Sequence, residues 1–130
     1  MDSVNRRIRI LIADDSLRAL DSVHRYLKSE PDFEVIATAT DGLQLLSKVA
    51  YHCPDLVLTD LSLPQINGLE ATTTLRKAFP KLRIIIFTAL NGISLRDECL
   101  KCGADGLIHK SEMPEKLLEE VRRLFPSDPA

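Results

Sequence analysis

The chain has 130 residues, of which 45% are apolar and 28% are charged, and its formal net charge is −2. These values are typical of one globular domain of ordinary size, and the slight negative charge predicts no general attraction for nucleic acid. No window holds the roughly 18 apolar residues of a membrane span, and no signal-peptide core precedes the first strand pattern, so we expect a cytoplasmic protein. We expect a single domain over residues 1–130. Its core would extend from about 8 to 125, and 126–130 would be a tail or the start of a linker.

The first half of the chain alternates strand and helix patterns. Short apolar runs at 8–13, 33–38 and 56–60 predict buried strands, since strands that are covered on both faces are apolar throughout. Ser16 suits the N-cap of a helix after the first strand, and Asp41-Gly42 opens a helix after the second. The residues predicted to face the core are Leu17, Leu20, Val23 and Leu27 in the first helix, and Leu43, Leu46, Val49 and Ala50 in the second.

The second half continues this alternation. Asn67-Gly68 opens a third helix, a strongly strand-forming run covers 83–88, and a weaker helix pattern extends from about 94 to 102. A short strand at 106–109 and a helix with Pro114 in its first turn complete the pattern. The last helix is predicted to bury Leu117, Leu118, Val121, Leu124 and Phe125.

Strict alternation of strands and helices predicts the fold class. Parallel strands joined by right-handed helical crossovers give an α/β fold with helices on both faces of the sheet. Five strands favour an open, doubly wound sheet, because a closed barrel of this type needs about eight. We therefore expect a five-stranded parallel sheet of the flavodoxin-like type, with strand order 2-1-3-4-5.

Polar residues stand at the carboxyl ends of four predicted strands: Asp14-Asp15, Asp60, Thr88 and Lys110. In the expected topology these ends share one edge of the sheet, where open α/β sheets bind their ligands. Like charges about 4 Å apart repel by roughly 4 kcal/mol at an effective dielectric of about 20, so the carboxylates require a raised pKa or a cation. Oxygen ligands completed by water suit Mg²⁺.

This set of groups matches the needs of phosphoryl transfer. A metal ion, the hydroxyl of Thr88 and the ammonium of Lys110 would neutralise three phosphoryl oxygens, and Asp60 would be the nucleophile that becomes an acyl phosphate. Each residue alone also has a structural explanation: a helix cap for Asp14, a turn for Asp60, an ordinary strand residue for Thr88 and a surface lysine for Lys110. Their joint placement at strand ends favours the functional interpretation.

These residues also carry a family resemblance that covers about residues 8–125. The chain resembles the receiver domain of two-component response regulators, and in particular the NarL/FixJ type. The matching positions are Asp14-Asp15, Asp60 followed by Pro64 and Gly68, Thr88-Ala89, Gly103-Ala104 and Lys110. The resemblance implies a phosphorylation-controlled switch in a transcription regulator, with an effector domain outside this sequence.

The resemblance also implies a role for each residue. Asp60 would accept a phosphoryl group from a histidine kinase, a phosphotransfer protein or a small phosphodonor. Asp15 would bind Mg²⁺ directly, Asp14 largely through water and Ser62 through its backbone carbonyl. Lys110 would pair with the phosphoryl group, and Thr88 would turn towards it and alter an output surface. A homodimer formed on phosphorylation is a further expectation, whereas DNA or membrane binding by these residues is not.

Three positions bear on switching and phosphoryl lifetime. Leu107 stands where the family usually has an aromatic residue that swings inward after the threonine. A leucine cannot make the same swing, so signalling through that face is not predicted from the resemblance. Ser111 replaces a proline that often follows a cis bond, and a cis bond before serine costs about 3 kcal/mol. Leu90, two residues after Thr88, is expected to shield an acyl phosphate from water.

Other functions fit the sequence less well. A phosphohydrolase of this chemistry commonly has a second aspartate two residues after the nucleophile, where this chain has Ser62. A flavin or nucleotide site would need a phosphate cradle where the chain has Asp14-Asp15. A phosphorylation-independent scaffold would not need the complete polar set. Cys99 and Cys102 lack a second ligand pair for zinc, so we expect them to be packing residues.

Overall fold

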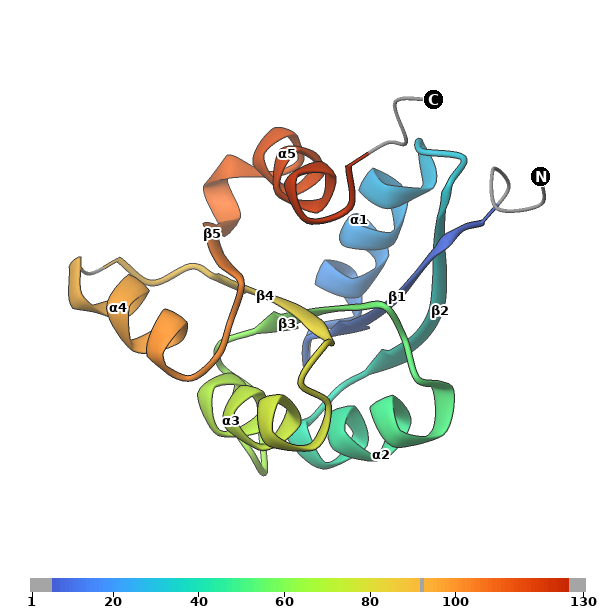
Figure 1. Cartoon of the computed structure of the whole chain (residues 1–130). Coiled ribbons are helices and arrows are strands. Elements are labelled where there is room, and N and C mark those ends of the chain that lie inside the picture. The colour runs from blue at the N-terminus through green and yellow to red at the C-terminus, as the bar shows by residue number, and fades with distance from the viewer. Residues whose placement is uncertain (1–5, 92, 127–130) are drawn as a thin grey trace.

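The computed structural model describes residues 6–91 and 93–126, in which five strands alternate with five α-helices (Figure 1). The elements are β1 (Ile8–Ala13), α1 (Leu17–Lys28), β2 (Phe33–Ala39), α2 (Gly42–His52), β3 (Leu56–Asp60), α3 (Gly68–Ala78), β4 (Arg83–Thr88), α4 (Ile93–Lys101), β5 (Gly106–His109), the 3₁₀ helix η2 (Lys110–Glu112) and α5 (Glu115–Leu124). The predicted strands agree with these bounds to within one residue. The 3₁₀ helix η2 was not predicted.

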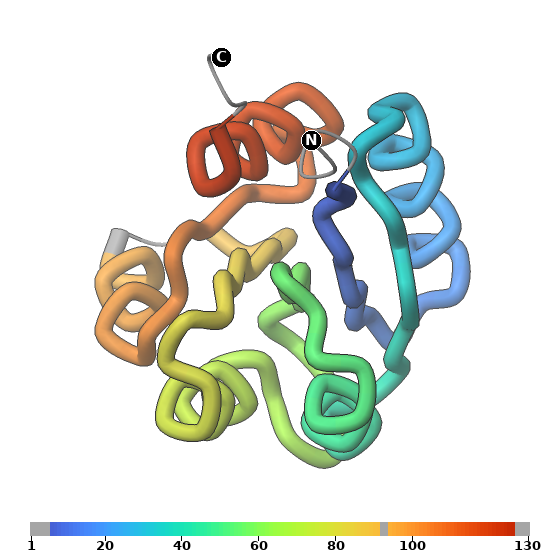
Figure 2. Tube along the Cα trace, turned by 45° about the vertical axis from the view of Figure 1, so that its right-hand side comes forward, coloured from blue at the N-terminus to red at the C-terminus, as the bar shows by residue number. Residues whose placement is uncertain are grey.

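The sheet confirms the expected fold class. All strands are parallel in the order β2-β1-β3-β4-β5, so β1 and β3 are neighbours at the point where the winding direction changes. Helices α1 and α5 cover one face, and α2, α3 and α4 cover the other (Figures 1 and 2). This arrangement leaves the ends of the strands uncovered by helices and available for a site.

Successive residues of the central strands pack against opposite helix layers. Ile10 and Ile12 belong to the core beneath α1 and α5, whereas Leu11 and Ala13 belong to the core beneath α2 and α3. Because strand side chains alternate between faces, such strands must be apolar at every position. The continuous apolar runs of the sequence follow directly from this two-sided burial.

Two predicted helix faces were partly wrong. Leu17 is 74% exposed, because it lies in the first turn of α1, beyond the sheet that buries Leu20. In α2 the buried stripe contains Leu45 and Val49 at helical spacing, so Leu43 is 54% exposed and Ala50 is also exposed. Both helices remain amphipathic, but the inward face of α2 is turned from the predicted one.

The helix ends follow their capping residues. The Ser16 hydroxyl accepts a hydrogen bond from the Ala19 N–H at 3.2 Å, as predicted for an N-cap. Asn67 caps α3 and forms a reciprocal capping box with Glu70. Gly103 ends α4 with φ at 108°, a left-handed conformation that favours glycine.

Cys99, the first cysteine of the predicted packing pair, is a core residue. Cys99 belongs to α4 and is fully buried, and burial, assisted by the charges of Cys102 and Glu98, raises the pKa of its thiol to about 11. A thiol with so high a pKa stays protonated and unreactive at neutral pH.

Within 6–91 and 93–126, no helix is both long and apolar enough to cross a lipid bilayer.

Candidate functional site

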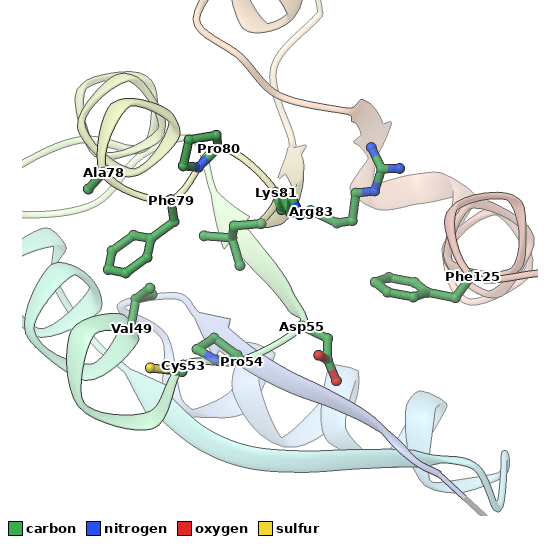
Figure 3. A pocket seen from close by; sticks show the side chains of 11 residues that line it. Val49, Cys53, Pro54, Asp55, Ala78, Phe79, Pro80, Lys81, Arg83 and Phe125 are labelled. Atoms are coloured by element: carbon green, nitrogen blue, oxygen red, sulfur yellow. The ribbon is translucent and has the colours of Figure 1, made fainter. Parts of the chain in front are cut away.

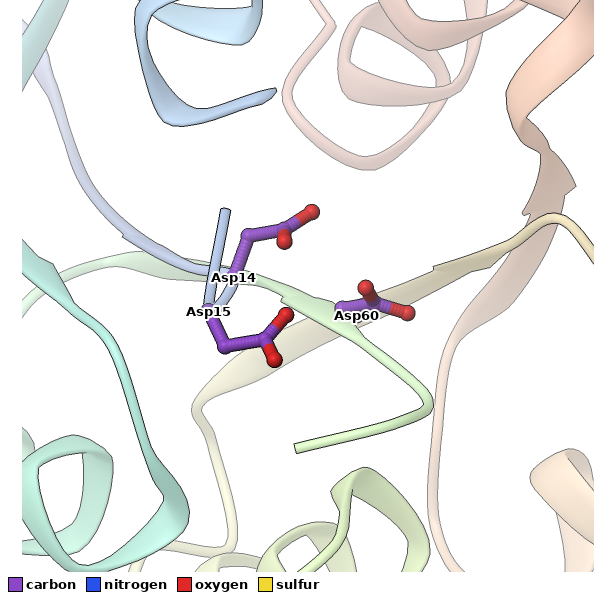
Figure 4. Close-up of side chains that lie close together, drawn as sticks. All are labelled: Asp14, Asp15 and Asp60. Carbon is purple, nitrogen blue, oxygen red and sulfur yellow. The ribbon is translucent and has the colours of Figure 1, made fainter. Parts of the chain in front are cut away.

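The predicted acidic residues meet at the carboxyl edge of β1 and β3. Ala13 pairs with Thr59 in the sheet, which places Asp14 beside Asp60, and the oxygens of Asp14, Asp15 and Asp60 lie within 4.8 Å of one another (Figure 4). The Asp14 side chain is 1% exposed and that of Asp60 is 10% exposed, whereas Asp15 faces solvent. The cluster therefore has a buried floor and one open side.

Lys110 connects the two buried carboxylates. Its Nζ lies 3.1 Å from Asp14 Oδ2 and 3.1 Å from Asp60 Oδ2, and 5.5 Å from the centre of the Phe87 ring. Burial lowers the pKa of Lys110, but the hydrogen bonds and charges of the two aspartates outweigh burial, so the net shift is upward. The ammonium therefore remains charged at neutral pH.

The second oxygen of each buried carboxylate is held by the backbone. Asp14 Oδ1 accepts the Ser16 N–H at 2.9 Å, and Asp60 Oδ1 accepts the Ser62 N–H at 3.1 Å. Burial is the main reason why the pKa of Asp60 is raised; the charge of Asp14 adds to it, and the bonds from Ser62 and Lys110 only partly compensate. The site thus holds negative charge that its own cation does not neutralise.

The donor set fits a hard divalent cation. Three carboxylates face one ammonium, and only carboxylate oxygens come together in the cluster. Oxygen ligands with an open side for water suit Mg²⁺ better than zinc, which prefers nitrogen and sulfur. Ser62, whose carbonyl was predicted as a ligand, lines the same open hollow of about 490 Å³ as Asp15.

Thr88 and Leu107 lie on the neighbouring strands β4 and β5. Thr88 is buried at the end of β4, one residue beyond the Asp60–Phe87 pair of the sheet, and its Oγ1 accepts the Leu90 N–H at 3.0 Å. Leu107 is half-buried against the core. The structure therefore brings Asp14, Asp15, Asp60 and Lys110 into one cluster, and places Thr88 beside it and Leu107 further away.

Sequence reasoning overlooked the turn that follows β5. His109 caps η2, and the bond between Lys110 and Ser111 is trans, as expected without a proline. The cis peptide bond of this turn lies instead at Met113–Pro114. A histidine directly before the lysine was the available signal, but its ring also reaches the Ala89 carbonyl, which is 20 residues away in the sequence.

A second hollow lies at the opposite edge of the sheet (Figure 3). It has a volume of about 520 Å³, and its walls include Phe79, Pro80 and Phe125. Asp55 and Arg83, which also line it, mark the amino ends of β3 and β4. Since Asp60 stands at the other end of β3, this hollow is separate from the acidic site.

Gly68 holds the loop after Asp60 close to the strand. Its N–H donates to the Leu61 carbonyl at 2.8 Å, and a β-carbon at this position would lie 2.5 Å from the Asp60 carbonyl oxygen. Alanine favours a helix over glycine by about 1 kcal/mol, but overpacking against backbone costs about 1–3 kcal/mol. We expect Gly68→Ala to lower the free energy of unfolding by up to about 2 kcal/mol and to weaken Mg²⁺ binding, as measured by urea denaturation and metal titration.

Gly106→Ala is the matched control for this prediction. A β-carbon there would meet the end of the Glu120 side chain at 2.8 Å, and a flexible side chain can move away. We expect a change in stability within about 0.5 kcal/mol and unchanged Mg²⁺ affinity. Equal losses in both variants would show that the close approach of Gly68 to Asp60 is not what matters.

Comparison with known proteins shows the family to which the chain belongs. The sequence matches the response regulator receiver domain over residues 10–122. It is 35% identical over 122 residues to the oxygen regulatory protein NreC of Staphylococcus epidermidis, with 93% of this chain and 56% of that protein covered. The chain spans about half the length of the curated relatives it matches.

Solved structures extend the similarity to three dimensions. A LuxR-family two-component response regulator from Aurantimonas sp. SI85-9A1 has a TM-score of 0.87 at 30% identity, with 91% of this chain and 84% of that chain covered. A chain of the CheX–CheY–BeF3–Mg complex from Borrelia burgdorferi has a TM-score of 0.89 at 27% identity, with 96% and 94% covered. The fold agrees with these matches, and the chain belongs to the family of response regulator receiver domains, of the NarL/FixJ type.

Proposed function

We propose that Asp60 is the phosphoacceptor of this receiver domain and that its phosphorylation switches an output surface. The observation that carries the proposal is the position of Lys110, whose ammonium bonds the buried carboxylates of Asp14 and Asp60 equally at the carboxyl edge of the sheet. A buried carboxylate with a raised pKa beside fixed positive charge is typical of a functional site. The donor would be the phosphohistidine of a histidine kinase or phosphotransfer protein, or a small acyl phosphate.

In the proposed reaction an oxygen of Asp60 attacks the phosphorus while the bond between phosphorus and the donor nitrogen or oxygen breaks. The Ser62 N–H orients the attacking carboxylate, and Lys110 moves with the charge that develops on the phosphoryl oxygens. Asp14, Asp15, Asp60 and the carbonyl of Ser62 would hold Mg²⁺, which supplies further neutralisation of the phosphoryl group when bound. The domain would thus catalyse its own phosphorylation and dephosphorylation without turning over other substrates.

The proposed output is protein contact, not direct contact with DNA. Thr88 would turn towards the phosphoryl group and alter the surface formed by α4, β5 and α5. The domain would form a homodimer on phosphorylation. NreC is named as an oxygen regulatory protein, and DegU of Brevibacillus brevis, which is 34% identical over 116 residues, as a transcriptional regulatory protein. We propose by analogy that the domain controls transcription in the cytoplasm through an effector domain.

Intact mass spectrometry tests the proposed function. Incubation of the protein with acetyl phosphate and Mg²⁺ should give one phosphoryl adduct, and a chelator of Mg²⁺ should prevent it. Absence of an adduct with acetyl phosphate and with a panel of phosphorylated histidine kinases, in a folded protein that binds Mg²⁺, would favour a scaffold. An adduct that forms without Mg²⁺ would contradict the metal site.

Leu90 is expected to lengthen the life of the acyl phosphate. Its side chain is 55% exposed and lines the same hollow as Asp15 and Ser62, where water would approach Asp60. A polar side chain there would position water, so we expect Leu90→Glu and Leu90→Asn to accelerate dephosphorylation about tenfold, which is less than the roughly 100-fold or more of full acid–base catalysis. Phosphoryl lifetimes equal to that of wild type in both variants, followed by intact mass, would remove this role.

A further inference from the structure

His109 ends β5 and holds two different segments with its ring. Nδ1 lies 2.7 Å from Ser111 Oγ and 3.1 Å from Ser111 N, and Nε2 lies 3.2 Å from the carbonyl oxygen of Ala89. A backbone N–H can only donate, so Nδ1 accepts from Ser111, and Nε2 of the neutral ring carries the hydrogen and donates to Ala89. The ring therefore ties the start of η2 to the loop between β4 and α4.

The tied loop is the one that holds Thr88. Thr88 pairs with His109 across β4 and β5, and Ala89 is the next residue along the chain. The Thr88 hydroxyl accepts the Leu90 N–H, so its own side chain holds one side of the loop while His109 holds the other. A turn of Thr88 towards Asp60 would give up the bond from Leu90 and move the carbonyl to which His109 donates.

The surroundings leave room for this movement. A cavity of about 200 Å³ between α4 and β5 is bordered by Thr88, Leu95, Leu107 and His109. Leu107 and Leu95 pack against the core, whereas Arg96 and Glu112 form the polar part of the cavity wall. Among the described side chains of β5, His109 is the one that hydrogen-bonds to the loop after Thr88.

We propose that His109 is a positioning residue that ties the loop after Thr88 to the turn after β5 and thereby opposes the reorientation of Thr88. The inference rests on the proposed function, because the reorientation matters only when Asp60 carries a phosphoryl group. The next residue, Lys110, hydrogen-bonds to Asp14 and Asp60. Two adjacent residues therefore hold the acidic cluster and the loop after Thr88. Loss of the bond to Ala89 shifts the loop towards the arrangement that meets the phosphoryl group.

Variants can separate this tie from the cap of η2. His109→Asn keeps an acceptor near the place of Nδ1 and is a good N-cap, but its side chain is too short to reach Ala89. His109→Gln retains an N–H donor near the place of Nε2. One hydrogen bond shifts an equilibrium about fivefold, so we expect His109→Asn to bind beryllofluoride with Mg²⁺ about fivefold more tightly than wild type, and His109→Gln to bind as wild type does.

Hydrogen exchange provides a readout that does not depend on phosphorylation. In metal-free protein the Leu90 amide should exchange about fivefold faster in His109→Asn than in wild type or His109→Gln. His24→Asn, on the exposed face of α1, is the matched control and should change neither measurement. The proposal would be overturned if His109→Asn had the beryllofluoride affinity and Leu90 exchange of wild type. It would also be overturned if His109→Gln showed the tighter binding and faster exchange expected of His109→Asn.

The two proposals fail in different ways. If wild type binds neither beryllofluoride nor a phosphoryl group, the proposed function is wrong, and Leu90 exchange still decides whether His109 ties the loop. If wild type is phosphorylated on Asp60 while His109→Asn matches it in both measurements, the function stands and the role of His109 is wrong.

Discussion

Asp60→Asn is expected to abolish the phosphoryl adduct and, in the absence of Mg²⁺, to make the folded protein more stable at neutral pH. The adduct is lost because an amide oxygen is a poor nucleophile that cannot form the acyl phosphate. Stability increases because burial, with the charge of Asp14, raises the pKa of Asp60, so the folded state disfavours its ionised form. The same carboxylate therefore supports the function and weakens the metal-free fold.

The pH dependence of this effect has a definite sign. Below the ordinary pKa of aspartate both folded and unfolded wild type are protonated at Asp60, so the variant has little advantage. As the pH rises from that value through the raised pKa of folded Asp60, wild type loses stability relative to Asp60→Asn, and above it the difference is constant. Urea denaturation at a series of pH values without metal measures this difference.

Added Mg²⁺ and a distant aspartate provide the controls. Mg²⁺ should raise the stability of wild type more than that of Asp60→Asn, because a ligand stabilises the state that binds it. Asp21→Asn, at an exposed position of α1 beside Arg25, should retain the adduct and show no comparable change in stability. A phosphoryl adduct that persists in Asp60→Asn would mean that another residue is the acceptor.

The strands and their order could be predicted because they depend on local composition and general topology. Runs such as Ile84–Phe87 are apolar at every position, and only strands covered on both faces require this pattern. Right-handed crossovers then left few arrangements of five parallel strands. The meeting of Asp14 with Asp60 followed from that topology, although the residues lie far apart in sequence.

The features that sequence reasoning missed depend on tertiary geometry. Leu17 has the periodicity of a core residue, but its exposure depends on where α1 extends beyond the sheet. Leu43 could not be distinguished from Leu45 as the inward residue, because small rotations of a helix have little effect on its pattern. The bond from His109 to Ala89 joins the end of β5 to the loop after β4, and no spacing in the sequence indicates it.

The role of each site residue is a separate question from its position. The structure places Lys110 between Asp14 and Asp60, but an ion pair in this place is compatible with a purely structural role. The charge has to be removed while the packing of the side chain is kept. Methionine does this, because its unbranched stem can retain the contact with Phe87.

Lys110→Met is expected to slow phosphorylation of Asp60 by about 100-fold, the usual cost of removing one fixed donor from a site of developing negative charge. The rate is measured by intact mass with acetyl phosphate and saturating Mg²⁺, so that a change in metal affinity does not limit it. Lys116→Met, which removes an exposed lysine paired with Glu119 on α5, should leave the rate unchanged. If Lys110→Met is phosphorylated as fast as wild type, its ion pairs with Asp14 and Asp60 serve only to hold the acidic edge together.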